Sequence, residues 1–159
     1  MMLIADLSGN GPASNVALLG KSVGPNQGPN TQYDQLADLS DYEAFVVEAK
    51  LPGGAGGTMQ VGLQRSMDGG VSWSDYIRFP DVLTADATGA AAKRYSVSPS
   101  LSNTIVQVGD SATAFTIAAN SCVGGPPGDR LRVLFVGQAS VNAAIAYTIK
   151  LYGSRRNPR

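Results

Sequence analysis

The chain has no histidine and one cysteine among its 159 residues. Without histidine it lacks the commonest general base, the Ser–His and Cys–His nucleophile pairs, and the ligand set of nearly all zinc sites. A single cysteine, Cys122, can form neither an internal disulfide nor a cysteine-based metal cage. We therefore expect no catalytic residue, no metal site and no cofactor, and we interpret Cys122 as a small buried apolar side chain.

Charge is also scarce, since Asp, Glu, Lys and Arg make up 15% of the chain against a usual ~25%. Twelve bases balance twelve acids, which argues against nucleic acid as a partner. The distribution is nevertheless uneven, because residues 1–48 hold six acids and one base. The last ten residues carry no acidic side chain and four basic ones: Lys150, Arg155, Arg156 and Arg159. This asymmetry favours docking on a complementary protein surface, and we name these four as candidate partner-binding residues.

Long apolar runs are missing too, so nothing in the sequence predicts a membrane span. The first residues, MMLIADLSGNG, have no basic region and too short an apolar run for a signal peptide. We expect no membrane partner, and we expect the chain to stay, or to assemble, in the compartment where it is made.

Glycine (19) and proline (9) are plentiful and mark turns. The segments between these turns alternate between apolar and polar residues. In 42–51 this alternation places Phe45, Val47, Ala49 and Leu51 on one face. About eight strands and no convincing helix predict an all-β, single-domain, two-sheet β-sandwich, jelly-roll-like rather than immunoglobulin-like, with a single-sheet barrel as second choice. We predict an extended Gly/Pro-rich arm over 1–32, a sandwich domain over 33–153 and a basic tail over 154–159.

The stretch SMDGGVSW (66–73) lies between two predicted strands, 59–66 and 73–79. Its spacing, S-x-D-x-G-x-S-W, resembles the Asp-box hairpin of sialidases and other β-propellers. Five residues match that pattern: Ser66, Asp68, Gly70, Ser72 and Trp73. An Asp in a turn accepts backbone hydrogen bonds, Gly permits positive φ, and Trp covers the turn.

The Asp-box resemblance implies a self-stapled structural turn, because the box lies on the periphery in those families. A propeller would also repeat it once per blade, whereas this chain has one copy. A glycosidase would need two carboxyl groups held in a cleft, and no spacing here indicates one. The sequence also has no calcium loop and no phosphate-binding loop of the standard patterns. A sugar-binding platform of exposed aromatic side chains remains an alternative.

Two segments, 61–79 and 128–155, resemble small virion proteins of tailed bacteriophages. The first, VGLQRSMDGGVSWSDYIRF, matches their hairpin, and the second, GDRLRVLFVGQASVNAAIAYTIKLYGSR, matches their closing pair of strands. The resemblance implies a structural, non-enzymatic virion protein, most readily a capsid decoration or cement protein that binds the major capsid protein as a homotrimer. The expected location is then the virion, assembled in the host cytoplasm. The alternative is a carbohydrate-binding module or a tail- or baseplate-associated receptor-binding domain.

Overall fold

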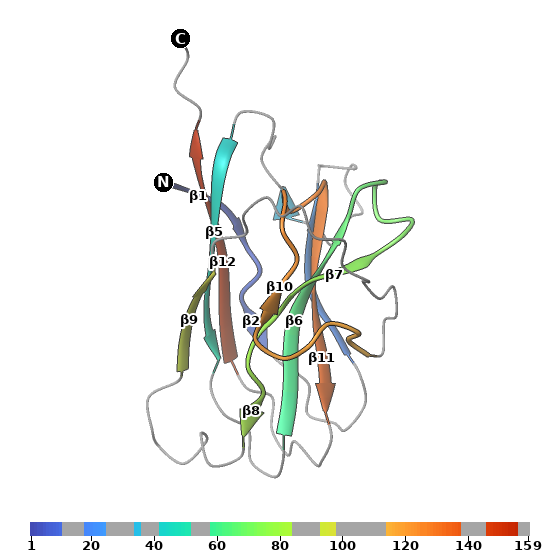
Figure 1. Cartoon of the computed structure of the whole chain (residues 1–159). Coiled ribbons are helices and arrows are strands. Elements are labelled where there is room, and N and C mark those ends of the chain that lie inside the picture. Colours follow the sequence, from blue (N-terminus) through green and yellow to red (C-terminus); the bar gives the residue numbers. More distant parts are fainter. Residues whose placement is uncertain are drawn as a thin grey trace.

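The structure is a computed structural model, and the following account concerns the residues it describes (Figure 1). These are 1–10, 18–24, 34–35, 42–51, 58–83, 93–97, 114–137 and 146–155. Within them every regular element is a β-strand, as the sequence predicts.

Eight of the strands are five or more residues long. They are β1 (Met2–Asp6), β3 (Leu18–Gly24), β5 (Tyr42–Leu51), β6 (Thr58–Ser66), β7 (Ser74–Arg78), β9 (Lys93–Val97), β11 (Arg130–Gly137) and β12 (Ala146–Arg155). Four more have two residues each: β2 (Gly9–Asn10), β4 (Asp34–Gln35), β8 (Val82–Leu83) and β10 (Ser121–Cys122). One sheet has the order β1-β12-β5-β9 with β2 also on β12, and the other has the order β10-β7-β6-β11-β3-β4 with β8 also on β6.

The connectivity of the eight longer strands is that of a jelly roll. Successive strands change sheet at every connection except β6 to β7, which stay side by side in the same sheet. The two four-strand sets, β1-β12-β5-β9 and β3-β11-β6-β7, pair antiparallel throughout. The first and last strands are therefore neighbours, and β6–β7 is the one long hairpin of the described chain. The predicted two-sheet, jelly-roll-like sandwich is confirmed.

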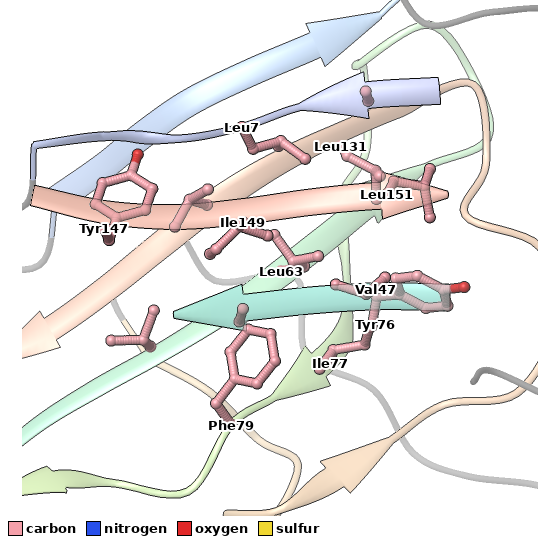
Figure 2. Packing of buried hydrophobic residues seen from close by; sticks show 14 of the residues in the cluster. Leu7, Val47, Leu63, Tyr76, Ile77, Phe79, Leu131, Tyr147, Ile149 and Leu151 are labelled. Atoms are coloured by element: carbon pink, nitrogen blue, oxygen red, sulfur yellow. The ribbon is translucent and has the colours of Figure 1, made fainter. Parts of the chain in front are cut away.

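The core lies between the two sheets (Figure 2). The inward face of β5 buries Phe45, Val47, Ala49 and Leu51, the set that the alternation predicts. The facing sheet contributes apolar side chains from β6, β7 and β11, and burial of each large one stabilises the fold by about 1.5–3 kcal/mol. The Phe135 and Tyr147 rings meet edge to face across the two layers with centroids 4.9 Å apart.

The amino-terminal segment differs from the predicted arm. Met2–Asp6 pairs with β12, and the next residue, Leu7, is fully buried in the core. Leu18–Gly24 pairs with β11 in the other sheet. Residues 11–17 and 25–32 lie outside the described residues. The Gly/Pro clusters thus flank strands whose partners are more than 100 residues away, and local composition carries no signal for such pairing.

The carboxyl-terminal end differs in a smaller way. Strand β12 continues to Arg155, so Ser154 and Arg155 belong to the sheet rather than to the predicted tail. Cys122, expected to be buried, is exposed, because it lies in the short strand β10 at the edge of its sheet.

Candidate functional site

The β6–β7 turn is built around the side chains of Ser66 and Asp68. The Ser66 hydroxyl donates to Asp68 Oδ1 (2.8 Å) and accepts from the backbone N–H groups of Asp68 (3.2 Å) and Gly70 (2.8 Å). Ser72 donates to the Asp68 carboxylate through its N–H (2.9 and 3.1 Å) and its hydroxyl (2.6 Å). The side chains of Ser66 and Asp68 thus accept hydrogen bonds from the backbone N–H groups of a turn that faces solvent.

Gly70 and Trp73 close the turn. Gly70 has a φ of +93°, a conformation that other residues rarely adopt. Its carbonyl accepts a hydrogen bond from Trp73 Nε1 at 3.1 Å. One face of the indole is covered by the Arg132 guanidinium, 4.3 Å from the ring centroid. The five residues of the Asp-box pattern therefore lie together in one hydrogen-bonded turn.

The electrostatics of the turn favour an ionised Asp68. Hydrogen bonds to its carboxylate, first from the Ser72 hydroxyl, then from the Ser72 N–H and the Ser66 hydroxyl, lower the pKa of Asp68 from 3.8 to about 2. The charge is present at neutral pH and both oxygens accept hydrogen bonds within the turn. The carboxylate therefore stabilises the turn and is poorly placed to serve as a general acid or base.

A second loop is hydrogen-bonded to this turn through Asp129, a residue outside the Asp-box pattern. Asp129 accepts the Gly69 N–H at 2.7 Å through Oδ2, and its own N–H donates to the Ser66 carbonyl at 2.9 Å. The preceding residue, Gly128, has a φ of +80° and lies so close to the Ser66 carbonyl that a Cβ would collide with it. The Gly-Asp pair at 128–129 is the only sequence signal for this attachment.

Arg65 and Tyr76 bind an earlier part of the same loop, residues 124–126. The Arg65 guanidinium donates to the carbonyls of Gly124 (3.2 Å) and Pro126 (2.6 Å) and lies 4.7 Å above the Tyr76 ring. The Tyr76 hydroxyl donates to the Gly125 carbonyl at 3.0 Å. Burial raises the pKa of Tyr76, so the phenol stays neutral at neutral pH. Burial also lowers the pKa of Arg65, but a guanidinium group is basic enough to keep its charge.

A buried polar network lies on the outward face of the seven-stranded sheet. Arg132 Nε donates to Gln64 Oε1 (2.8 Å), and Gln64 Nε2 donates to Asp75 Oδ1 (2.8 Å). Asp75 Oδ2 accepts the N–H (2.7 Å) and the hydroxyl (3.0 Å) of Thr116. Gln64 and Asp75 have no exposed surface. A β-bulge at Tyr76 turns Asp75 outward toward Gln64 while Tyr76 and Ile77 stay in the core.

Residues 114–119 form no strand, and Phe115 and Thr116 contact the sheet at Gly62 and Asp75. The Phe115 ring lies over Gly62, where a Cβ would collide with it, and Ile117 is buried. Arg78 donates to the Ile117 carbonyl (3.1 Å) and pairs with Asp81 (2.9 Å). Side-chain bonds from the sheet thus replace the backbone ladder that a strand would make.

The candidate partner-binding residues are not one cluster. Lys150 lies opposite Glu48 on the outward face of the five-stranded sheet, and Arg155 is exposed at the end of β12. Arg156 and Arg159 lie outside the described residues. Lys150 lines a shallow groove of about 400 Å³ together with Glu48, Lys50, Tyr95, Thr148 and Tyr152. A second hollow of about 470 Å³ lies between β7, β9 and β10 and includes Phe79 and Cys122.

The described residues contain no group of three or more His, Cys, Asp or Glu side chains placed to hold a metal ion. They also contain no apolar helix of the length needed to cross a membrane. Comparisons of the chain with protein-family models, with curated proteins and with solved structures found no match in any of the three.

Proposed function

We propose that the chain is a structural, non-enzymatic protein of a tailed-phage virion, a capsid decoration or cement protein that docks on the major capsid protein. It would act as a homo-oligomer, a trimer being the expected form, on particles assembled in the host cytoplasm. The observation that carries the proposal is the strand order, β1-β12-β5-β9 facing β3-β11-β6-β7, since viral capsid domains are among the main users of the jelly roll.

The arrangement of the polar side chains supports an architectural role. Asp68, Asp75 and Asp129 each bind backbone N–H groups or neighbouring side chains of the scaffold. Both oxygens of Asp68 and of Asp75 accept hydrogen bonds from the protein itself, and Asp129 binds the β6–β7 turn through Oδ2. The resemblance to phage virion proteins covers β6, β7 and β11, which are neighbours in one sheet, and β12, which lies in the other sheet and does not pair with β11.

The second candidate, a carbohydrate-binding or receptor-binding domain, draws on the same fold, because lectins also use jelly rolls. An exposed row of aromatic rings would favour it. Tyr147 is buried and offers no stacking face, and Arg132 covers one face of the partly exposed Trp73. Tyr152 in the groove beside Lys150 is the half-exposed ring that favours this candidate.

The two functions separate in one set of measurements. Particles of the encoding virus are purified to homogeneity, and the copy number of this chain per shell is determined by quantitative mass spectrometry and by cryo-electron microscopy. A decoration protein is expected in tens to hundreds of copies on the shell lattice. Its presence only at the tail, or its absence from particles together with binding on a glycan array, would replace the proposal with the second candidate.

A further inference from the structure

The β6–β7 turn contains a dipeptide that is chemically unstable in flexible chains. Asp68–Gly69 is the one Asp-Gly sequence in the chain. In such a pair the glycine nitrogen attacks the side-chain carboxyl carbon of the aspartate, a C–N bond forms, and one molecule of water leaves as a succinimide ring closes. Water then opens the ring at either carbonyl and yields aspartate or isoaspartate. Glycine favours the reaction because it has no side chain to hinder the attack, and the exposed position of Asp68 supplies the water.

The carboxyl group that would be attacked is held by other residues. Asp68 Oδ1 accepts from the Ser66 hydroxyl (2.8 Å) and the Ser72 N–H (2.9 Å), and Oδ2 accepts from the Ser72 hydroxyl (2.6 Å). Ring closure removes one of these oxygens as water, so hydrogen bonds to the carboxylate have to break first. The same bonds lower the pKa of Asp68 to about 2, which keeps the protonated form, from which water leaves more readily, scarce at neutral pH.

The nitrogen that would attack is held as well, by a residue from another loop. The Gly69 N–H donates to Asp129 Oδ2 at 2.7 Å, a contact between positions 60 residues apart. Asp129 is itself fixed, because its own N–H donates to the Ser66 carbonyl at 2.9 Å. The Gly69 nitrogen has to lose its proton in order to attack, and a negatively charged acceptor disfavours that loss. Both reacting groups of Asp68–Gly69 are therefore restrained by the fold.

We infer that Asp68–Gly69 is a site of isoaspartate formation in this protein and that Asp129 suppresses the reaction by holding the Gly69 nitrogen. The reaction proceeds from molecules in which the turn has opened, and the free energy of local opening sets their fraction. Isoaspartate would route the backbone through the former side chain, add one carbon to the turn, and move the carboxylate away from Ser66 and Ser72. Asp129 is thus a positioning residue that extends the chemical lifetime of the turn, whatever the protein binds.

The test measures isoaspartate in forms of the full chain that are incubated at neutral pH, below the unfolding transition. Wild type is compared with Asp129→Ala, and Asp81→Ala is the control, because Asp81 also binds a neighbouring side chain but lies outside the turn. A synthetic peptide of residues 66–73 gives the rate without the fold. Peptide mapping by mass spectrometry separates the product at Asp68 from that at Asn10–Gly11, where deamidation also forms isoaspartate. Thermal unfolding verifies that each variant is folded during the incubation.

The peptide should react fastest, and wild type and Asp81→Ala should react slowest and at equal rates. Asp129→Ala should form isoaspartate about tenfold faster than wild type, because the loss of one hydrogen bond to a charged group raises the open fraction by about that factor. Asp129→Asn keeps a weaker, neutral acceptor, so its rate should lie between these two, and it replaces Asp129→Ala in the comparison if that variant does not fold.

Two results would overturn the role of Asp129. Equal rates in wild type and the Asp129 variants would show that the bond to the Gly69 nitrogen does not limit the reaction. Slower reaction in the variants would show that the Asp129 carboxylate acts as a base toward the Gly69 N–H instead of restraining it. A wild-type rate equal to that of the peptide would overturn the protection by the fold altogether.

Discussion

The buried link between Gln64 and Asp75 makes Asp75→Asn an informative perturbation. Arg132 Nε donates to Gln64 Oε1, which fixes the orientation of the Gln64 amide and directs its NH2 group toward Asp75. The Asp75 carboxylate accepts this bond and two more from Thr116. Asparagine has nearly the same shape but only one acceptor oxygen. If that oxygen stays on Thr116, the new NH2 group faces the NH2 group of Gln64, and two donors meet with no acceptor between them.

Two effects of opposite sign determine how much the Asp75 substitutions change the free energy of unfolding. A buried donor left unsatisfied costs about 1–3 kcal/mol, so Asp75→Asn should lower the free energy of unfolding by about 2 kcal/mol. Asp75→Ala, which takes the acceptor from three donors, should lower it by about 3–5 kcal/mol. Removing a buried charge relieves desolvation and acts in the other direction. We expect the lost hydrogen bonds to outweigh the relieved desolvation, because the carboxylate accepts three short bonds and one of its donors, Gln64, is fully buried.

Urea unfolding followed by circular dichroism measures these differences, and about 2 kcal/mol corresponds to roughly 4–8 °C in Tm for a chain of this size. Asp81→Asn is the matched control, because Asp81 is partly exposed in its pair with Arg78 and should contribute no more than about 1 kcal/mol. An Asp75→Asn protein as stable as wild type, or more stable, would refute the reasoning and show that desolvation of the carboxylate outweighs its bonds.

Three smaller predictions use the same unfolding assay. Gly62→Ala should cost about 1–3 kcal/mol, because its Cβ would collide with the Ile77 backbone carbonyl and with the Phe115 ring; an unchanged Tm would contradict both close approaches. Asp68→Asn should remove a pH dependence. The wild-type carboxyl, with its pKa lowered to about 2, adds stability above its ordinary pKa of 3.8 that is lost as the pH falls toward 2, and parallel curves for variant and wild type would contradict this. Trp73→Phe should cost about 1 kcal/mol through the lost bond to the Gly70 carbonyl, and a loss below ~0.3 kcal/mol would count against that bond.

The hairpin could be predicted in detail because its bonds are local. Ser66, Asp68 and Ser72 lie within seven positions of one another, and the residue types that make such a turn are few. The strands of the core were predictable for a similar reason, since one buried face imposes a period of two on β5 and β12. Both signals are contained in a short stretch of sequence.

The remaining features depend on residues distant in sequence. Strand β1 exists because β12, almost 150 residues away, supplies its hydrogen-bond partners, and MLIAD alone has no clear alternation. The covered outer face of β6 was missed because Gln64 looks like a solvent-facing residue in an alternating strand, whereas Thr116 and Phe115 bury it. A weak signal was present, since a glycine at position 62 in a strand indicates the close approach of another group.

The connectivity of the jelly roll gives a physical reason why the β6–β7 turn has so many internal hydrogen bonds. Every other pair of consecutive long strands lies in different sheets. The β6–β7 connection stays in one sheet and projects past its end, where neither layer supports it (Figure 1). Its order therefore has to come from its own side chains and from Asp129. A turn stabilised in this way keeps its shape while Met67 and Val71 remain exposed.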